Sequence, residues 1–142
     1  MKTILQIIED AGGLAAFTWA RIENPPFMLL VIESLGEPGP NGHRALSIAH
    51  YGEQNGDLMR DPEMCFELTE LPDSSLTLNA FYWRNDYAGI EEWSRYRQND
   101  LPMTRSVTHA EHVAFAAQWS QNLIDQDFFE ALESMFKELK TP

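Results

Sequence analysis

The spacing of apolar residues is helical at the start of the chain, strand-like in its middle and helical again at its end. In the first segment, Thr3 followed by Gln6 has the form of a capping box, and Gly12-Gly13 has the form of a helix stop. The apolar residues between these signals recur every three or four positions and are Ile4, Ile7, Ile8 and Ala11. This pattern predicts one short N-terminal helix.

Two strands are expected next. Residues 17–23 alternate imperfectly between apolar and polar, residues 27–32 form a continuous apolar run, and Asn24-Pro25-Pro26 separates the two. A continuous apolar run of this length is typical of a strand that is buried on both faces. Residues 36–43 contain three glycines and two prolines, so we expect them to form an exposed connection.

Three more strands are predicted at residues 45–51, 64–69 and 76–83. The residues expected on one face of the middle strand are Met64, Phe66 and Leu68, and those on the other are Cys65, Glu67 and Thr69. The connections between the three strands are too short to contain a crossover helix. We therefore expect an antiparallel meander.

Residues 87–105 are predicted to form a short helix followed by a loop. The residues that suggest helical spacing are Tyr87, Ile90, Trp93 and Tyr96. Gly89 and the stretch from Asn99 to Pro102 interrupt that spacing, which is why the helix should be short.

Two longer helices should complete the chain. Thr108 with Glu111 has the form of a second capping box, and Asp127 with Glu130 has the form of a third. The apolar stripe of the first helix comprises Val113, Ala116, Ala117, Trp119, Leu123 and Ile124, and that of the second comprises Phe128, Leu132, Met135, Phe136 and Leu139. These stripes should pack on the sheet or on a partner.

The predicted fold is therefore α+β, with an antiparallel sheet of about five strands, a short N-terminal helix and two C-terminal helices. No internal repeat, low-complexity segment or shift of composition divides the chain, so we expect residues 1–142 to form a single domain.

Charge and cysteine content limit the classes of function. Ten basic and 22 acidic residues give a formal net charge of −12, which disfavours direct contact with nucleic acid or with anionic membranes. Because Cys65 is the single cysteine, an intrachain disulfide is impossible and a cysteine-based zinc site would lack ligands. With no apolar run of signal-peptide or membrane-span length, we expect a cytoplasmic protein.

The segment 50–68 carries the most information about function. It joins two predicted strands through Asn55-Gly56 and Asp61-Pro62, and two turn signals in one link predict a structured excursion. Residues 53–73 contain seven acidic residues and one arginine, so this segment carries six of the twelve net negative charges. The acidity is concentrated in this part of the sequence.

Two interpretations of these acidic residues remain open. Asp57, Asp61 and Glu63, with the side-chain amide of Asn55, could supply oxygen ligands to Mg²⁺ or Ca²⁺, and His50 could carry a proton. Their spacing does not match an EF-hand loop. The alternative is that the aspartates accept hydrogen bonds from neighbouring backbone N–H groups in Asx turns.

Other candidate chemistry is sparse. His109 and His112 could share a metal at i, i+3 spacing, but they do not form an HExxH motif, and a solvated helix start is the preferred interpretation. Cys65 lies between apolar neighbours and should be an inert packing thiol. No P-loop, GxSxG, GxGxxG or kinase motif is present, and we expect no cofactor.

The segment 81–87 interleaves aromatic residues with Arg84 and ends at Tyr87. Such a combination is found in protein interfaces and in base-stacking sites. The alternative is a core-facing strand that turns at Asn85-Asp86, and this alternative is preferred.

Two motifs carry a resemblance to a known family. The run HYGEQNGDLMRDPEM at residues 50–64, together with NDYAG at residues 85–89, resembles a family of uncharacterised bacterial domains associated with phages, plasmids and integrated mobile elements. The resemblance covers roughly residues 27–90. Since that family has no established activity, it implies a biological context and no particular chemistry.

Two hypotheses follow. The first is a non-enzymatic accessory protein that contacts a basic protein partner, in one version as a DNA-mimic-like inhibitor. The second is a small enzyme or ligand-binding domain that uses a His/Asp/Glu cluster, with or without a divalent cation. The candidate binding residues are His50, Tyr51, Asn55, Asp57, Asp61, Glu63, Arg84 and Tyr87. The wide apolar arc of the last helix could also support a homodimer.

Overall fold

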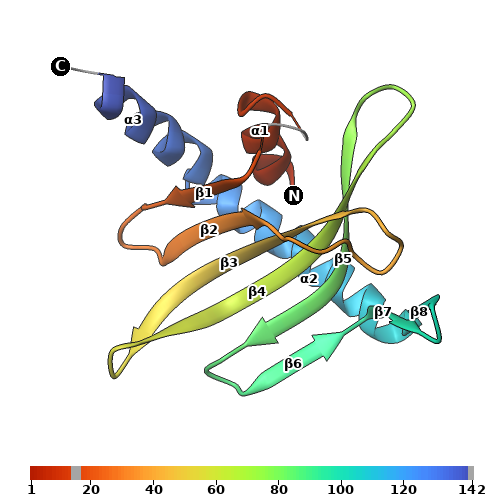
Figure 1. Ribbon diagram of the computed structural model, residues 1–142. Helices are drawn as coiled ribbons and strands as arrows, with labels where there is room; N and C mark the ends of the chain where they lie inside the picture. Colours follow the sequence, from red (N-terminus) through yellow and green to blue (C-terminus); the bar gives the residue numbers. More distant parts are fainter. Residues whose placement is uncertain (14–16, 141–142) are drawn as a thin grey trace.

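The computed structural model describes residues 1–13 and 17–140, with side chains described as far as residue 137. The elements in chain order are α1 (Lys2–Asp10), β1 (Trp19–Ile22), β2 (Leu29–Ser34), β3 (Arg44–Gln54), β4 (Asp57–Glu70), β5 (Leu76–Asn85), β6 (Ile90–Trp93), β7 (Arg95–Gln98), β8 (Leu101–Thr104), α2 (Ser106–Asp125) and α3 (Phe128–Lys140). Strands β1 to β6 form one sheet in sequence order, and β7 pairs with β8 in a separate hairpin (Figure 1).

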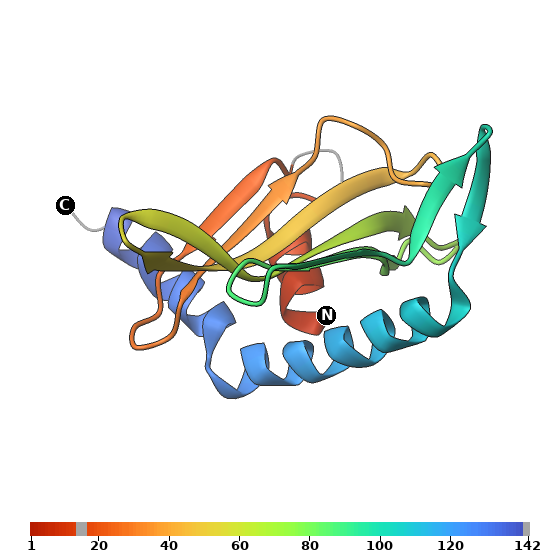
Figure 2. The same ribbon diagram turned by 90° about the horizontal axis from the view of Figure 1, so that it is seen from below.

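The predicted α+β class is confirmed, as are the antiparallel sheet, the N-terminal helix and the two C-terminal helices. All three helices of the described residues lie on one side of the sheet, and α2 runs along that face (Figure 2). We call this the covered face and the opposite side the open face. The β7–β8 hairpin stands at one end of the sheet (Figure 2). None of the described helices has the length and apolarity that crossing a membrane requires.

The link between β3 and β4 is a two-residue hairpin turn, so the predicted excursion is wrong. Asn55 and Gly56 both have positive φ, 52° and 86°, which matches the twist of the flanking strands and lets their pairing continue to the turn. Asp61-Pro62 lies within β4, at a shift of register against β3, and does not form a second turn. The polar residues of this link are therefore strand residues.

The predicted helix within residues 87–105 is also wrong, because this segment forms three short strands. The chain reverses after β5 through a turn at 86–89, where Gly89 has a φ of 66°, and β6 then pairs with β5. Asn99 and Asp100 both have positive φ and close the β7–β8 hairpin. Gly89, Asn99 and Asp100, which interrupt the helical spacing in the sequence, therefore lie in hairpin turns.

The main core lies between the sheet and the helices, and the predicted alternation of β4 is confirmed there. Met64, Phe66 and Leu68 belong to this core, while Cys65 belongs to a small cluster on the open face. That cluster comprises Ala45, Cys65, Phe81 and Tyr82. A shift of register between β4 and β5 places both aromatic residues of the cluster on the open side.

Strand β2 is buried on one face, which corrects the expectation that residues 27–32 would be buried on both. Leu30 and Ile32 are fully buried against the helices, whereas Val31 on the open face is half-buried. Phe27 and Met28 precede the strand and are exposed. Because no described helix covers the open face, the apolar run does not meet two apolar layers.

The helices begin where expected to within a few residues, but two of the predicted capping boxes do not form. The residue before α1 is Met1 and that before α2 is Arg105, and neither makes a side-chain capping hydrogen bond. Helix α3 begins directly after Asp127, which has a φ of 57°. In α2, Ala116, Trp119 and Leu123 are buried, while Val113 and Ile124 are exposed. The side chain of Leu139 lies outside the described residues.

The 36–43 connection is attached to the sheet more firmly than its composition predicted. Glu67, on β4, is fully buried and accepts hydrogen bonds from the backbone N–H groups of Asn41 and His43, at 3.0 and 3.1 Å. The buried guanidinium of Arg95 forms an ion pair with its other oxygen. Gly39 and Pro40 are consequently buried, which corrects the prediction of a fully exposed loop.

Candidate functional site

The predicted binding residues lie on different parts of the molecule. His50 faces the helices, whereas its neighbour Tyr51 pairs with Arg60 and lies on the open face. Asn55 and Asp57 are exposed at the tip of the β3–β4 hairpin. The predicted binding residues therefore do not converge on one site.

The predicted carboxylates are spread along the hairpin, and two of them, Asp61 and Glu63, have partners of their own. Glu63 accepts a hydrogen bond from Ser47 Oγ at 2.5 Å and lies 3.3 Å from Arg60 Nη1. Asp61 accepts a hydrogen bond from the side-chain amide of Asn85 at 2.7 Å rather than forming an Asx turn. At about 3.3 Å per residue, the two ends of β4 are roughly 40 Å apart, so the acidity of residues 53–73 is not concentrated in space.

Within the described part of the chain, no three His, Cys, Asp or Glu side chains are close enough to hold a metal ion together. Cys65 is buried, and that burial raises the pKa of its thiol to about 12, which keeps the reactive thiolate scarce at neutral pH. The prediction of an inert packing thiol fits this environment.

Arg84 and Tyr87, from the aromatic segment, lie at the end of β5 and in the turn that follows it. Arg84 Nε donates to Asp86 at 2.7 Å, and the hydrogen bond raises the pKa of the guanidinium further. Asp86 also accepts from the backbone N–H of Arg60 at 2.8 Å, which ties this turn to β4. The Tyr87 hydroxyl lies against Gly52, where a Cβ atom would overlap it.

A cavity of about 230 Å³ lies between α2 and the sheet, beside His50. It is lined by Phe27, Met28, His50, Pro62, Phe115, Gln118, Trp119, Asn122 and Gln126. We call it the His50 cavity. Its walls combine aromatic rings with three side-chain amides, and no Asp, Glu, Lys or Arg is among the lining residues.

His50 itself is held by an aromatic cluster and by hydrogen bonding to the backbone. Its ring centroid lies 5.4 Å from that of Trp119 and 5.4 Å from that of Phe128. Nδ1 lies 3.1 Å from the carbonyl oxygen of Met28, which can only accept, so Nδ1 carries the proton. Burial lowers the pKa of this histidine below its usual 6.5, so the ring is neutral at pH 7 and Nε2 is an acceptor.

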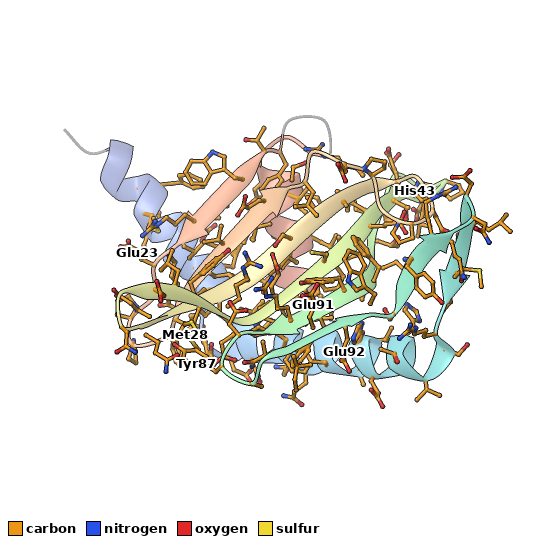
Figure 3. All side chains as sticks on the ribbon, turned by 60° about the horizontal axis from the view of Figure 1, so that its bottom comes forward. Glu23, Met28, His43, Tyr87, Glu91 and Glu92 are labelled. Carbon is orange, nitrogen blue, oxygen red and sulfur yellow. The ribbon has the colours of Figure 1, made fainter. Side chains whose placement is uncertain are left out.

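A second cleft, of about 540 Å³, lies beside the edge strand β6. It is lined by Glu91, Glu92, Trp93, Tyr96, Arg105 and Thr108, and we call it the β6 cleft. Glu91 lies on the open-face side of β6 opposite Arg84, and Glu92 is directed towards α2 (Figure 3). Trp93 is 47% exposed, and its ring centroid lies 4.7 Å from that of Tyr82.

A trio formed by the buried Ser94 and His112 and the half-buried Glu92 was not identified from the sequence. His112 Nδ1 lies 2.9 Å from Ser94 Oγ, and Nε2 lies 3.4 Å from a Glu92 oxygen. The prediction of a solvated helix start is wrong for His112, which is only 2% exposed. Its spacing to Ala116 and Trp119 would have placed it on the buried face of α2.

This trio contains the residue types of a nucleophilic triad, but its serine is fully buried. A nucleophile must reach the substrate, which the Ser94 hydroxyl cannot do in this position. The trio instead attaches the corner between β6 and β7 to α2, together with the backbone hydrogen bond from Arg105 N–H to the Ser94 carbonyl at 2.8 Å. Its role is structural.

The chain belongs to the family DUF6908, a domain of unknown function, whose model matches residues 2–129. The match spans all eight strands and the whole of α2, so the residues that line the His50 cavity and the β6 cleft all lie within it. The part of the resemblance that concerned an uncharacterised domain is confirmed. Comparison with curated proteins and with solved structures yielded no match.

Proposed function

We propose that this protein is a non-enzymatic binding domain that captures a basic segment of a partner protein at the β6 cleft. The observation that carries the proposal is Trp93, a half-exposed indole at the edge of the sheet, next to Glu91 and Glu92. An exposed aromatic ring with the Glu91 carboxylate on the same face has the chemistry that lysine and arginine side chains bind, while Glu92 is directed towards α2.

A cation at this position would meet two favourable groups. It would lie over the face of Trp93 and form an ion pair with Glu91, because Arg84, across from Glu91, is already directed to Asp86. The chain makes a similar contact internally, where the Arg105 guanidinium lies 5.4 Å from the centroid of the Tyr96 ring. The formal net charge of −12 would speed the approach of a basic partner.

The backbone of β6 offers a second element of recognition. In the described sheet β6 pairs with β5 on one side only, which leaves one edge for an extended peptide to join. Added main-chain hydrogen bonds would supply affinity, and alternate side chains of the peptide would reach Glu91 and Trp93 on the open face.

Several finer expectations belong to this proposal. A basic DNA-binding protein would present the required side chains, and the domain would then act as a DNA-mimic-like inhibitor. We also propose a bacterial, mobile-element setting and a cytoplasmic location, which would suit an accessory protein of this kind. A homodimer through α3 would depend on Phe136, which is 53% exposed, because Phe128 and Leu132 are buried within the chain.

The test uses a ten-residue peptide of alternating arginine and valine, with a peptide of alternating glutamate and valine as its charge control. Binding is measured by calorimetry at low and at high salt. The variant Trp93→Ala with Glu91→Gln should weaken binding of the basic peptide about tenfold, equivalent to ~1.4 kcal/mol. Glu92 is left unchanged because it contacts the structural His112.

The matched control is Trp19→Ala with Glu33→Gln, which removes the same residue types from the opposite edge of the sheet. Trp19 is 65% exposed on β1 and pairs with Glu33 on β2. This control should bind the basic peptide like the wild type. The proposal fails if both double variants lose affinity equally, if the acidic peptide binds as well, or if low salt yields no complex.

A further inference from the structure

We infer that the His50 cavity is a binding site for a small molecule carrying a neutral, planar heteroaromatic group of one or two rings. This site shares no lining residue with the β6 cleft, so the inference stands apart from the proposed function. Five observations carry it: the cavity's size, its aromatic walls, its lack of charge, its polar groups and its opening.

The size and walls select a flat ring. A cavity of about 150 Å³ lined by apolar residues can hold benzene, so about 230 Å³ leaves room for one or two fused rings. The rings of Phe115 and Trp119 meet edge to face at 6.2 Å, and Phe27 adds an aromatic side chain at the rim. Aromatic groups of a ligand pack favourably in offset or edge-on arrangements against such rings.

The absence of charge in the lining selects a neutral ligand. Charged residues make up 23% of the chain, yet all nine residues that line the cavity are uncharged when His50 is neutral. A ligand with a formal charge would lose its hydration without gaining a counter-charge at the cavity wall.

The polar groups of the cavity select a heteroaromatic ring over a hydrocarbon. Trp119 is only 4% exposed, and its indole N–H has no hydrogen-bond partner among the described residues. Buried donors of this kind are normally paired, but this N–H is inaccessible to a water-sized molecule, so the other polar groups of the wall are the ones that a ligand would bond. His50 Nε2 is an acceptor, and the amides of Gln118 and Asn122 supply both donors and acceptors.

The cavity opens to solvent through apolar side chains. Phe27, Met28 and Phe115 are each about two-fifths exposed, which is unusual for three large apolar residues around one opening. Met28 lies at the same end of the sheet as Tyr87, beside the hairpin tips (Figure 3). Exposed apolar groups around a concave site are a common feature of ligand entrances.

The experiment titrates ¹⁵N-labelled full-length protein with three neutral probes, namely benzimidazole, nicotinamide and adenine, at pH 7.5. Benzoate and benzamidine serve as charged controls of similar size. The indole N–H resonance of Trp119, assigned with the variant Trp119→Phe, reports directly on the site. At least one neutral probe should shift this resonance saturably with a Kd of about 0.1–1 mM, the range expected for so small a ligand. The charged controls should bind at least about tenfold more weakly.

Two substitutions on α2 form a matched pair. Gln118 and Gln121 are both exposed, and each donates a side-chain hydrogen bond to the residue four positions later, at 3.0 and 2.8 Å. Gln118 lines the cavity and Gln121 does not. Gln118→Trp should block the opening and weaken probe binding at least about tenfold, while Gln121→Trp should leave it unchanged.

Three results would overturn the inference. The first is that no neutral probe shifts the Trp119 resonance at about 10 mM. The second is that charged and neutral probes bind alike. The third is that the two tryptophan variants bind equally. Should Gln118→Trp fail to fold, as judged by its circular dichroism, the Trp119 resonance of the wild-type protein still decides between binding in the cavity and no binding there.

Discussion

Two buried histidines lie between α2 and the sheet, His112 on α2 itself and His50 on β3, and they have different surroundings. Both ring nitrogens of His112 have protein partners, Ser94 and Glu92, and next to them the buried Arg95–Glu67 ion pair holds the 36–43 loop. His50 instead lines a cavity and makes its hydrogen bond through Nδ1. We call these the closed end and the open end.

The contrast shows that a histidine between the sheet and α2 can either complete the internal hydrogen bonding, as His112 does, or line a cavity, as His50 does. At the closed end, both nitrogens of the His112 ring have partners inside the protein, so this ring offers no free hydrogen-bonding group to a ligand, although Arg95 Nη1 is buried without a partner among the described residues. At the open end, the side chains of His50 and Trp119 line a cavity, and the buried indole N–H of Trp119 has no hydrogen-bond partner among the described residues. A buried histidine therefore suggests a site only when its surroundings leave space and unpaired hydrogen-bonding capacity.

The largest expected effect concerns the buried charge at the closed end. Glu67→Ala should lower the free energy of unfolding by about 3–5 kcal/mol, because Arg95 would remain buried without its counter-charge. Glu63→Ala is the matched control, since Glu63 lies on the same face of β4 but its partner Arg60 is partly exposed. It should cost about 1–2 kcal/mol. Equal losses in urea denaturation would remove the distinction between the two positions.

A pair of glycine-to-alanine substitutions tests how easily the side chains at each end can move to accommodate an added Cβ atom. A Cβ at Gly39 would overlap the side chain of Glu67, which is held by three hydrogen-bonding groups, so Gly39→Ala should cost about 2–3 kcal/mol. A Cβ at Gly52 would overlap the hydroxyl of Tyr87, the far end of an exposed side chain. That side chain can move, so Gly52→Ala should cost less than about 1 kcal/mol.

Urea denaturation measures both glycine variants. Adding Tyr87→Phe to Gly52→Ala should recover most of the small loss, because it removes the overlapping oxygen. If Gly52→Ala proved as costly as Gly39→Ala, the open end would be as rigid as the closed end, and the comparison would lose its basis.

The smallest expected effect is the pH dependence that His50 contributes. Because burial lowers its pKa in the folded state, the unfolded chain binds more protons at this residue. The resulting stability is complete above about pH 6.5 and is lost as pH falls from there through the folded-state pKa. His50→Phe should abolish this contribution, so the wild type should lose more stability than the variant between pH 7.5 and pH 5.5.

The comparison of wild type with His50→Phe isolates this histidine from His109, whose pKa is also lowered, chiefly by burial, and whose contribution has the same sign. Chemical denaturation at each pH supplies the measurement. Parallel losses in the two proteins would mean that His50 does not titrate differently in the folded and unfolded states.

Part of the fold followed from local patterns. The alternation of Met64, Phe66 and Leu68 predicted the two faces of β4 correctly but not its start at Asp57, and the spacing of Ala116, Trp119 and Leu123 placed α2. The helix predicted after β5 was wrong because Tyr87, Ile90 and Trp93 are three positions apart. Apolar residues can have that spacing either in a short helix or in a short strand with its preceding turn. The pairing of β6 with β5 decided the outcome.

Only single residues of the candidate sites could be predicted from the sequence. His50 was a candidate from its residue type and its position before the Asn55-Gly56 turn, but its cavity also needs Phe27 and Trp119, which are far from it in sequence. The pairing of Glu67 with Arg95 spans 28 positions. No local pattern reports a contact of that length, because only the packed fold brings the two side chains together.

The sequence by itself determined the α+β class, the order of most elements and the acidic balance, since these depend on short-range spacing and on composition. The tertiary structure decided where the charges lie, which histidine is bonded on both sides, and that an uncharged cavity forms beside the other. Those outcomes depend on burial and on contacts between side chains that are far apart in the sequence. Burial and these contacts determine which polar groups are satisfied within the protein and which remain for a ligand.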